Sequence, residues 1–227
     1  MQPSEYEGTT HWETEVYSRE RQVNRWPHTE IVSRLIRVTS GLDRSGVRIL
    51  ELGCGTGNNL RFLAEEGFDS YGIDASPTAV AKARELLHCH GLNARIQTGD
   101  MAQLPWPEGY FDLILDRAAL VHNAPDRIHG ILKEVVRVLK HGGRVLSIGL
   151  KSIEHPELQF GQKGKNGAWT DFSHGKFRNL GDMTFCNDFE VQEFFDGFDI
   201  ESAEKVTRRN LNGEILDEEF IVEAVRR

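Results

Sequence analysis

The strongest constraint on the fold is a regular alternation of short apolar runs with amphipathic segments between residues 45 and 150. Five apolar runs predict strands, at 47–52, 68–73, 94–98, 110–115 and 144–148. The segments between them carry apolar residues at helical spacing, as from Ile128 to Leu139. Strands that alternate with helices form parallel sheets covered on both faces. We therefore expect an α/β fold with a Rossmann-like, doubly wound sheet of five parallel strands.

Two segments fall outside this alternation. Residues 11–42 predict two helices with a break at Arg25-Trp26-Pro27, because proline disfavours helix in the residue before it. Residues 151–187 are rich in glycine, lysine and aromatic residues, and such a long loop in a compact domain is usually functional. Asn187 to Glu190 resembles a capping box, and residues 199–206 and 219–225 predict a closing antiparallel hairpin.

These segments predict one domain over residues 1–227. Its parts are an N-terminal helical cap, a ligand-binding core, a substrate-facing insert and a C-terminal helix with closing strands, at 1–44, 45–150, 151–187 and 188–227.

Composition excludes several classes of function. The net charge of -8 disfavours binding to phosphate backbones, so no nucleic acid partner is expected. Residues 1–17 lack a basic segment followed by an apolar run, and no run of about 18 apolar residues occurs, so neither secretion nor a membrane is predicted. The three cysteines form no Cys-x-x-Cys pair, which is typical of a reducing compartment. We expect a cytoplasmic protein, either a monomer or a homodimer.

No metal site is predicted. His88-Cys89-His90 would lie on a helix, where neighbouring side chains point about 100° apart and cannot converge on one ion. Asp116, Asn123 and Asp171 do not form a convincing ligand set either.

A glycine-rich loop follows the first predicted strand, in the order Glu51-Leu-Gly-Cys-Gly-Thr-Gly57. Glycines there let the backbone turn sharply and approach a ligand, while the next helix presents free amide hydrogens. The loop thus predicts a nucleotide-like ligand. A dinucleotide fingerprint would need its third glycine at position 58, which is Asn58, so a nicotinamide dehydrogenase is disfavoured.

Acidic residues follow three of the predicted strands. Glu51, Asp74 and Asp100 lie at carboxyl ends of strands, where ligands bind in open α/β sheets. Asp74, some 20 residues after the loop, is placed to accept hydrogen bonds from ribose hydroxyls. Three carboxylates would repel a pyrophosphate but not a sulfonium that carries an amino group. The pattern favours a cationic ligand without phosphate.

The order of these motifs resembles that of class I S-adenosylmethionine-dependent methyltransferases. The resemblance rests on Val47 to Gly57, Tyr71-Gly-Ile-Asp74, Gly99-Asp100, Leu104 to Ile114 and Val138 to Gly143, and it spans about 45 to 150. Asn24-Arg-Trp-Pro27 and Asn58-Asn59-Leu60 are similar to uncharacterised bacterial methyltransferases of polysaccharide and small-molecule biosynthesis clusters.

The resemblance implies S-adenosyl-L-methionine as the cofactor and names the residues that would hold it. They are Glu51, Gly53, Cys54, Gly55, Asp116 and Arg117 towards the methionine part, Asp74 at the ribose, Asp100 and Met101 towards the adenine, Tyr17 and Arg25 from the cap towards the carboxylate, and also Asn59 and Ala75. Arg25 has an equally simple interpretation as a solvated helix end.

Methyl transfer to a hydroxyl is helped by a base near neutral pKa, which histidine provides. The candidate bases are His122, after the fourth strand, and His155 and His174, in the insert. Trp169, Phe172 and Phe177 could form an apolar wall over the acceptor, or pin the insert to the core.

The expected reaction is O-methylation of a small polar molecule such as a sugar or a natural-product intermediate. The alternatives are C-methylation of a quinone-like ring and a catalytically silent cofactor-binding accessory protein.

Overall fold

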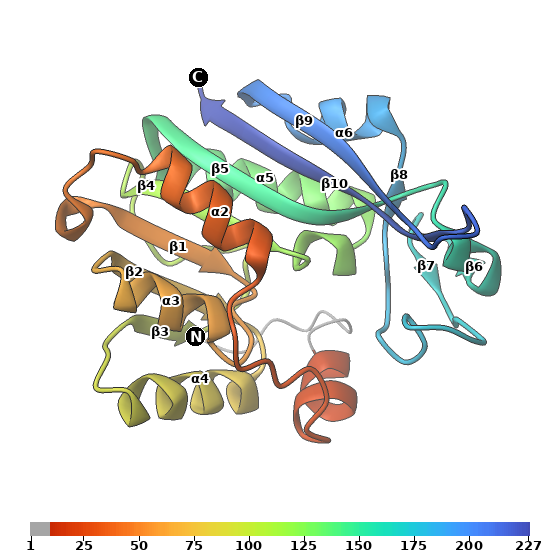
Figure 1. Cartoon of the computed structure of the whole chain (residues 1–227), viewed down its shortest axis with the longest axis horizontal. Coiled ribbons are helices and arrows are strands. Elements are labelled where there is room, and N and C mark those ends of the chain that lie inside the picture. The colour runs from red at the N-terminus through yellow and green to blue at the C-terminus, as the bar shows by residue number, and fades with distance from the viewer. Residues whose placement is uncertain (1–9) are drawn as a thin grey trace.

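The central sheet has the strand order β3-β2-β1-β4-β5-β10-β9 (Figure 1). The structure is a computed structural model that describes residues 10–227. Five of the strands in this range run parallel, namely β1 (Arg48–Leu52), β2 (Asp69–Asp74), β3 (Arg95–Thr98), β4 (Phe111–Arg117) and β5 (Leu139–Ser152). The predicted Rossmann-like sheet is confirmed.

The order in which successive strands are added to the sheet reverses beside β1. The chain proceeds from β1 to β2 and β3 on one side and then returns to β4 on the other side of β1. Where the order reverses, the loops after β1 and β4 turn towards opposite faces and leave a crevice at the carboxyl ends of the strands. The functional site is built there.

Alternate residues of the strands face two apolar clusters. On one face Ile49 of β1 packs with Leu35 of α2 (Thr29–Val38) and with α3 (Asn58–Glu65) and α4 (Pro77–Cys89). On the other face Leu50 packs with α5 (Pro125–Val138) and α6 (Asp188–Phe194). Figure 1 shows α2 and α3 on one side of the sheet and α5 on the other. Because both faces of the sheet are buried, the strand sequences are nearly continuous runs of apolar residues.

Two helix starts follow patterns visible in the sequence, an N-cap with proline after it at Ser76-Pro77 and the predicted capping box at Asn187. Ser76 Oγ accepts from the backbone N–H of Ala79 at 3.0 Å, with proline at the first position of α4. Asn187 and Glu190 form the predicted capping box of α6. The predicted strand at 144–148 begins earlier than expected: β5 starts at Leu139, directly after α5, and Gly142, at φ +72°, lies within it.

The N-terminal segment forms a short π-helix and a regular α-helix. η1 (Trp12–Tyr17) is a π-helix, and an extended stretch through the predicted break at Arg25-Trp26-Pro27 connects it to α2. A short turn, η2 (Arg44–Gly46), leads into β1. Residues 1–9 lie outside the described residues. They belong to the predicted cap and to the segment in which we predicted no secretion signal.

The segment predicted as a long insert contains short elements. They are η4 (Pro156–Phe160), β6 (Gln162–Lys163), β7 (Trp169–Thr170) and β8 (Phe185–Cys186). β8 pairs parallel with the end of β5, and β6 pairs with β7 away from the main sheet. Two-residue strands leave no periodic signal in the sequence, which is why sequence patterns missed them.

The closing hairpin is longer than predicted. β9 (Phe198–Arg209) and β10 (Ile215–Arg226) pair antiparallel, and β10 also pairs antiparallel with β5.

Within residues 10–227 no helix has the length and hydropathy needed to cross a membrane.

Gly57 is predicted to tolerate no side chain. Its φ is +83°, and a Cβ there would lie 2.8 Å from the Cβ of Ala83 in α4. Gly67 has a similar φ of +86° with nothing within 4 Å, so it is the matched control. Both alanine variants incur left-handed strain of about 1–2 kcal/mol, but only Gly57→Ala adds overpacking of about 1–3 kcal/mol. Denaturant unfolding measures the difference, and equal losses at the two positions would contradict it.

Candidate functional site

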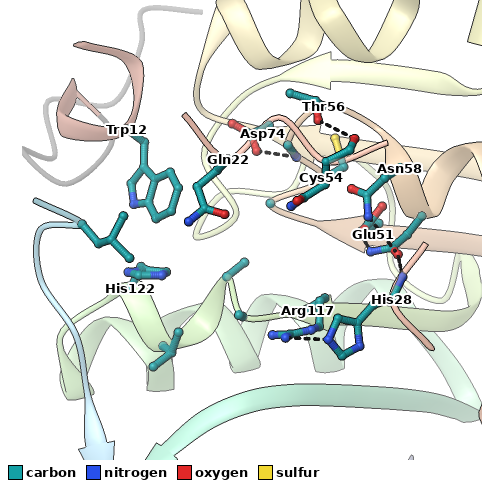
Figure 2. Close-up of a pocket in the computed structure, with 18 of the residues that line it drawn as sticks. Trp12, Gln22, His28, Glu51, Cys54, Thr56, Asn58, Asp74, Arg117 and His122 are labelled. Carbon is teal, nitrogen blue, oxygen red and sulfur yellow. Dashed lines mark hydrogen bonds between the residues drawn. The ribbon is translucent and has the colours of Figure 1, made fainter. Parts of the chain in front are cut away.

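A cavity of about 550 Å³ opens at the carboxyl ends of the parallel strands (Figure 2). Its walls come from η1, the extended stretch before α2, the loops after β1, β2, β3 and β4, and the insert. In Figure 2 Glu51, Cys54 and Asp74 lie on one side, Trp12 and His122 face them across the space, and Arg117 lies with His28 along a third edge. The cavity therefore joins all the segments that the topology brings to the switch point.

Two glycines shape the loop after β1. Gly53 and Gly55 have φ of +55° and +52°, which glycine alone adopts at little cost. A Cβ at Gly53 would lie 2.5 Å from the Cβ of Ala119, and one at Gly55 would lie 2.8 Å from the hydroxyl of Tyr17. The backbone of the loop therefore lines the cavity directly, and Tyr17 from η1 covers it.

Asp74 ties the loop after β1 to the end of β2. Its Oδ2 accepts from the backbone N–H of Gly55 at 2.8 Å, and its Oδ1 accepts from that of Ser76 at 2.9 Å. Burial raises the pKa of Asp74 to about 6, although these two hydrogen bonds act in the opposite direction. The carboxylate is thus ionised at neutral pH. Each oxygen keeps a lone pair for a ligand hydroxyl.

Glu51 carries a buried oxygen without a partner. Its Oε1 accepts from Asn59 Nδ2 at 2.7 Å and the backbone N–H of Leu60 also favours the charged carboxylate, whereas Oε2 is buried and forms no hydrogen bond of ordinary geometry with the described residues. Burial raises the pKa of this carboxyl to about 8, with a smaller contribution from the charge of Asp74 and an opposing hydrogen bond from Asn59. A buried acceptor without a donor is costly, and a cationic ligand group would satisfy it.

The extended stretch before α2 lies against the glycine-rich loop. Asn58 Nδ2 donates to the carbonyl of Trp26 at 3.0 Å, and the backbone N–H of His28 donates to Asn59 Oδ1 at 3.0 Å. Trp26 and His28 line the cavity, whereas Arg25 is exposed and does not. His28, three residues after Arg25, is therefore the basic side chain of this stretch that borders the cavity.

Three further predicted cofactor residues follow β2 and β3. Ala75, Asp100 and Met101 all border the cavity. Asp100 is already engaged, because Arg127 Nη2 lies 2.5 Å from its Oδ1 and the backbone N–H of Ala102 donates to the same oxygen at 2.8 Å.

Asp116 does not line the cavity, although the sequence placed it beside the ligand. It is fully buried and accepts from Ser147 Oγ at 2.6 Å and from the backbone N–H groups of Ala119 and Leu120. These bonds hold the turn that leads into η3 (Leu120–His122). Asp116 thus supports the wall that carries His122.

Arg117 lines the cavity and contacts His28. Its Nη2 lies 2.8 Å from His28 Nε2, and because a guanidinium has only donors, Nε2 is the acceptor and the imidazole proton is on Nδ1. Burial and the charge of Arg117 lower the pKa of His28 to about 4. The imidazole is therefore neutral at physiological pH.

His122 is the one of the three candidate histidines that lines the cavity within residues 10–227. Its Nδ1 lies 3.3 Å from the carbonyl oxygen of Asp182, so Nδ1 is the donor and Nε2 carries the lone pair. The ring meets Trp12 edge-on at 4.6 Å between centroids. Burial lowers the pKa of His122 to about 4, which keeps it an unprotonated base at neutral pH.

The other two histidines lie outside the cavity. His155 is buried, with Nδ1 accepting from the backbone N–H of Glu157 at 3.1 Å and Nε2 donating to Asp217 at 2.9 Å. His174 is exposed and pairs with Ser173. Neither reaches the space that His122 faces, so the structure offers no geometry for the base role that we predicted for them.

The insert contributes part of the wall. Of the aromatic residues expected there, Phe177 lines the cavity, while Trp169 and Phe172 pack against Phe185.

Sequence patterns did not single out several lining residues, namely Trp12, Gln22, His28, Lys151, Leu180 and Met183. Only the fold brings these positions together.

Within residues 10–227 no group of three or more histidine, cysteine or acidic side chains is placed to hold a metal ion, and metal independence stays a prediction.

Comparisons with known proteins concern mainly the core. Residues 49–143 match a family model described as a methyltransferase domain. A 2-methyl-6-phytyl-1,4-hydroquinone methyltransferase of Synechocystis is 38% identical over 106 residues, 45% of this chain and 32% of that protein. A 27-O-demethylrifamycin SV methyltransferase of Amycolatopsis mediterranei is 31% identical over 105 residues, 45% of this chain and 38% of that protein. The matches span less than half the length of these curated relatives.

The fold has solved counterparts. The structure of a magnesium protoporphyrin IX methyltransferase from Synechocystis with bound SAM superposes with a TM-score of 0.67 at 16% identity, covering 100% of both chains.

We predict that the ring of His122 titrates with a pKa near 4. Its ordinary pKa is about 6.5, so stability that depends on the neutral ring is present above about pH 6.5 and is lost as the pH falls towards 4. Nitrogen NMR of the imidazoles, assigned with His122→Asn, measures the midpoint and the tautomer. A midpoint at or above the ordinary value, or a proton on Nε2, would contradict this.

Proposed function

We propose that this chain, whose residues 49–143 form a class I S-adenosylmethionine-dependent methyltransferase domain, transfers a methyl group from that cofactor to a hydroxyl oxygen of a small molecule. The observation that carries the proposal is the unpartnered, buried oxygen of Glu51 beside a loop whose glycines leave no room for a Cβ. An amino group fits Glu51, and a ribose fits Asp74 at the end of the next strand.

Other lining residues fit the rest of that cofactor. Met101 and Ala75 supply apolar contacts at the adenine end, and the ion pair of Asp100 with Arg127 closes that end. At the other end the Nδ1–H of the neutral His28 ring is buried without an acceptor among the described residues and suits the carboxylate of the cofactor. When bound, the cofactor supplies a methyl group activated by a sulfonium.

His122 is the proposed base. Because its Nδ1–H is held by the carbonyl of Asp182, its Nε2 lone pair is available to accept a hydrogen bond from an acceptor hydroxyl. A pKa near 4 makes the ring a weak base that is unprotonated across the physiological range. It therefore orients the hydroxyl and takes up its proton as the oxygen is methylated, while Trp12 fixes the plane of the ring.

The acceptor half of the cavity favours a natural-product intermediate over a bare sugar. Val121, Phe177, Leu180 and Met183 form an apolar wall there, and apolar walls contribute to affinity only when the ligand buries apolar surface. The same wall keeps C-methylation of a quinone-like ring as the second candidate, in line with the hydroquinone methyltransferase among the relatives. A small-molecule acceptor, a cytoplasmic location and a monomeric or homodimeric state remain predictions.

Calorimetry with adenosylhomocysteine and NAD tests the cofactor assignment. We expect adenosylhomocysteine to bind and NAD to show no heat. At neutral pH binding should release a proton, because the carboxyl of Glu51, with a pKa of about 8, must ionise to pair with the ligand ammonium. The release is measured by repeating the titration in buffers of different ionisation enthalpy. Glu51→Gln should abolish it, whereas exposed Glu85→Gln should not. Tight binding of NAD alone would overturn the proposal.

A turnover assay tests the base. With a radiolabelled methyl donor and a panel of phenols and hydroxylated natural products, we expect His122→Ala to lower kcat by about 10²–10³-fold for any acceptor that is methylated on oxygen. Its affinity for adenosylhomocysteine should not change, and His174→Ala should behave as the wild type. Unchanged turnover in His122→Ala would eliminate the base role. Methyl transfer to ring carbon would favour the second candidate, and cofactor binding without any turnover would favour an accessory protein.

A further inference from the structure

The charged residues that line the cavity are segregated by sign. The half that we assign to the cofactor carries the carboxyl groups of Glu51, Asp74 and Asp100, the last of which is paired with Arg127. The wall formed by the end of β4, the end of β5 and the insert carries Arg117, Lys151 and Lys176 against the single carboxylate of Asp217. In a protein of net charge -8 this cationic wall is unusual.

The two lysines belong to a network in which cations outnumber carboxylates. Asp217 Oδ1 accepts from Lys151 Nζ at 3.0 Å and from Lys176 Nζ at 2.6 Å, and its Oδ2 accepts from Arg208 at 2.6 Å. Glu219 accepts from Lys151 at 2.9 Å and from Arg208 at 3.1 Å. Three cations thus share two carboxylates. Lys176 makes one of its three possible hydrogen bonds here, which leaves two donors for another partner.

Arg117 adds a further positive charge that has no ion-pair partner among residues 10–227. Its guanidinium donates to the neutral ring of His28, and the carboxylates of Asp116 and Glu219 act on its charge without forming an ion pair with it. Its Nε–H is buried and finds no acceptor in the same range. Buried cations are normally paired, because removing a charge from water is costly. The acceptor half of the cavity is therefore arranged around positive charge that the described residues do not balance.

Apolar side chains border the same space. Phe177 lies directly after Lys176, whose Nζ is 5.1 Å from the centre of its ring, and Leu180 and Met183 follow in the insert. An inorganic anion would leave the apolar side chains without a contact, and an apolar ligand would leave the cations without an anion. Only a molecule that has both an anionic group and an apolar body contacts both sets of side chains.

We propose that the methyl acceptor is an anionic molecule with an apolar body, whose carboxylate or phosphate is bound by Lys176 and Arg117 while its hydroxyl faces His122. The body packs on Phe177, Leu180 and Met183. This inference rests on the proposed function and narrows its substrate class. Because Lys176 reaches the cavity from the insert, it sets the specificity of the acceptor site without touching the cofactor half.

The test uses the full-length protein saturated with adenosylhomocysteine. The probes are aromatic acids paired with their neutral primary amides, such as 4-hydroxybenzoate with 4-hydroxybenzamide and the corresponding cinnamyl and naphthyl pairs, together with phenyl phosphate. Calorimetry or ligand-observed NMR measures each affinity. We expect at least one acid to bind about tenfold or more tightly than its amide, as a charge-assisted hydrogen bond would give. Comparison of the acids with phenyl phosphate distinguishes the two anions.

Variants locate the preference. Lys176→Met should reduce the preference for acid over amide to less than about threefold, Lys176→Arg should restore most of it, and Lys163→Met, an exposed lysine of the insert outside the cavity, should leave it unchanged. A panel in which no acid binds more tightly than its amide, or a preference that survives Lys176→Met, would overturn the inference. Neither result affects adenosylhomocysteine binding, whose failure would instead remove the proposed function.

Discussion

The site depends on the hydrogen bond from the backbone N–H of Gly55 to the carboxylate of Asp74. This 2.8 Å contact joins the loop after β1 to the end of β2 and fixes the backbone that lines the cavity. It requires the left-handed conformation of Gly55, which in turn lets the hydroxyl of Tyr17 approach from η1. The parallel sheet supplies the remaining constraint, because reversal of the strand order beside β1 brings the end of β4 to the same crevice.

Around this contact the cavity is divided by the chemistry of its walls. Carboxyl groups at the ends of β1 and β2 suit a cationic, ribose-bearing ligand, and the unsatisfied oxygen of Glu51 is the clearest sign of one. Across the space, His122 offers an unprotonated nitrogen next to cations and apolar side chains. Carboxyl groups at the ends of β1 and β2 and cations at the ends of β4 and β5 thus border different parts of the cavity, so the two reactants would be oriented by the field of the cavity as well as by its shape.

The parts of the site that sequence could predict are those fixed by local chemistry. Gly53, Gly55 and Asp74 follow buried strands, and such positions are visible as glycines or acidic residues after apolar runs. The capping box at Asn187 is visible for the same reason. Residues brought in by long-range packing were not visible: His28 lines the cavity because its stretch lies on Asn59, and Lys176 because its insert folds back towards β10. Long-range packing also explains why His155 does not reach the cavity: its ring is bonded to Asp217, which lies 62 residues away in the sequence.

A crystal structure of the complex with adenosylhomocysteine would decide whether this cavity holds the cofactor. We expect the ribose hydroxyls to lie about 3 Å from the carboxylate of Asp74 and the amino group equally close to Glu51 Oε2. We also expect the sulfur to face the side of the cavity that holds His122 and Trp12. A ligand bound in the reverse direction, with its amino acid end at Asp100, or bound outside this cavity, would disprove the cofactor assignment.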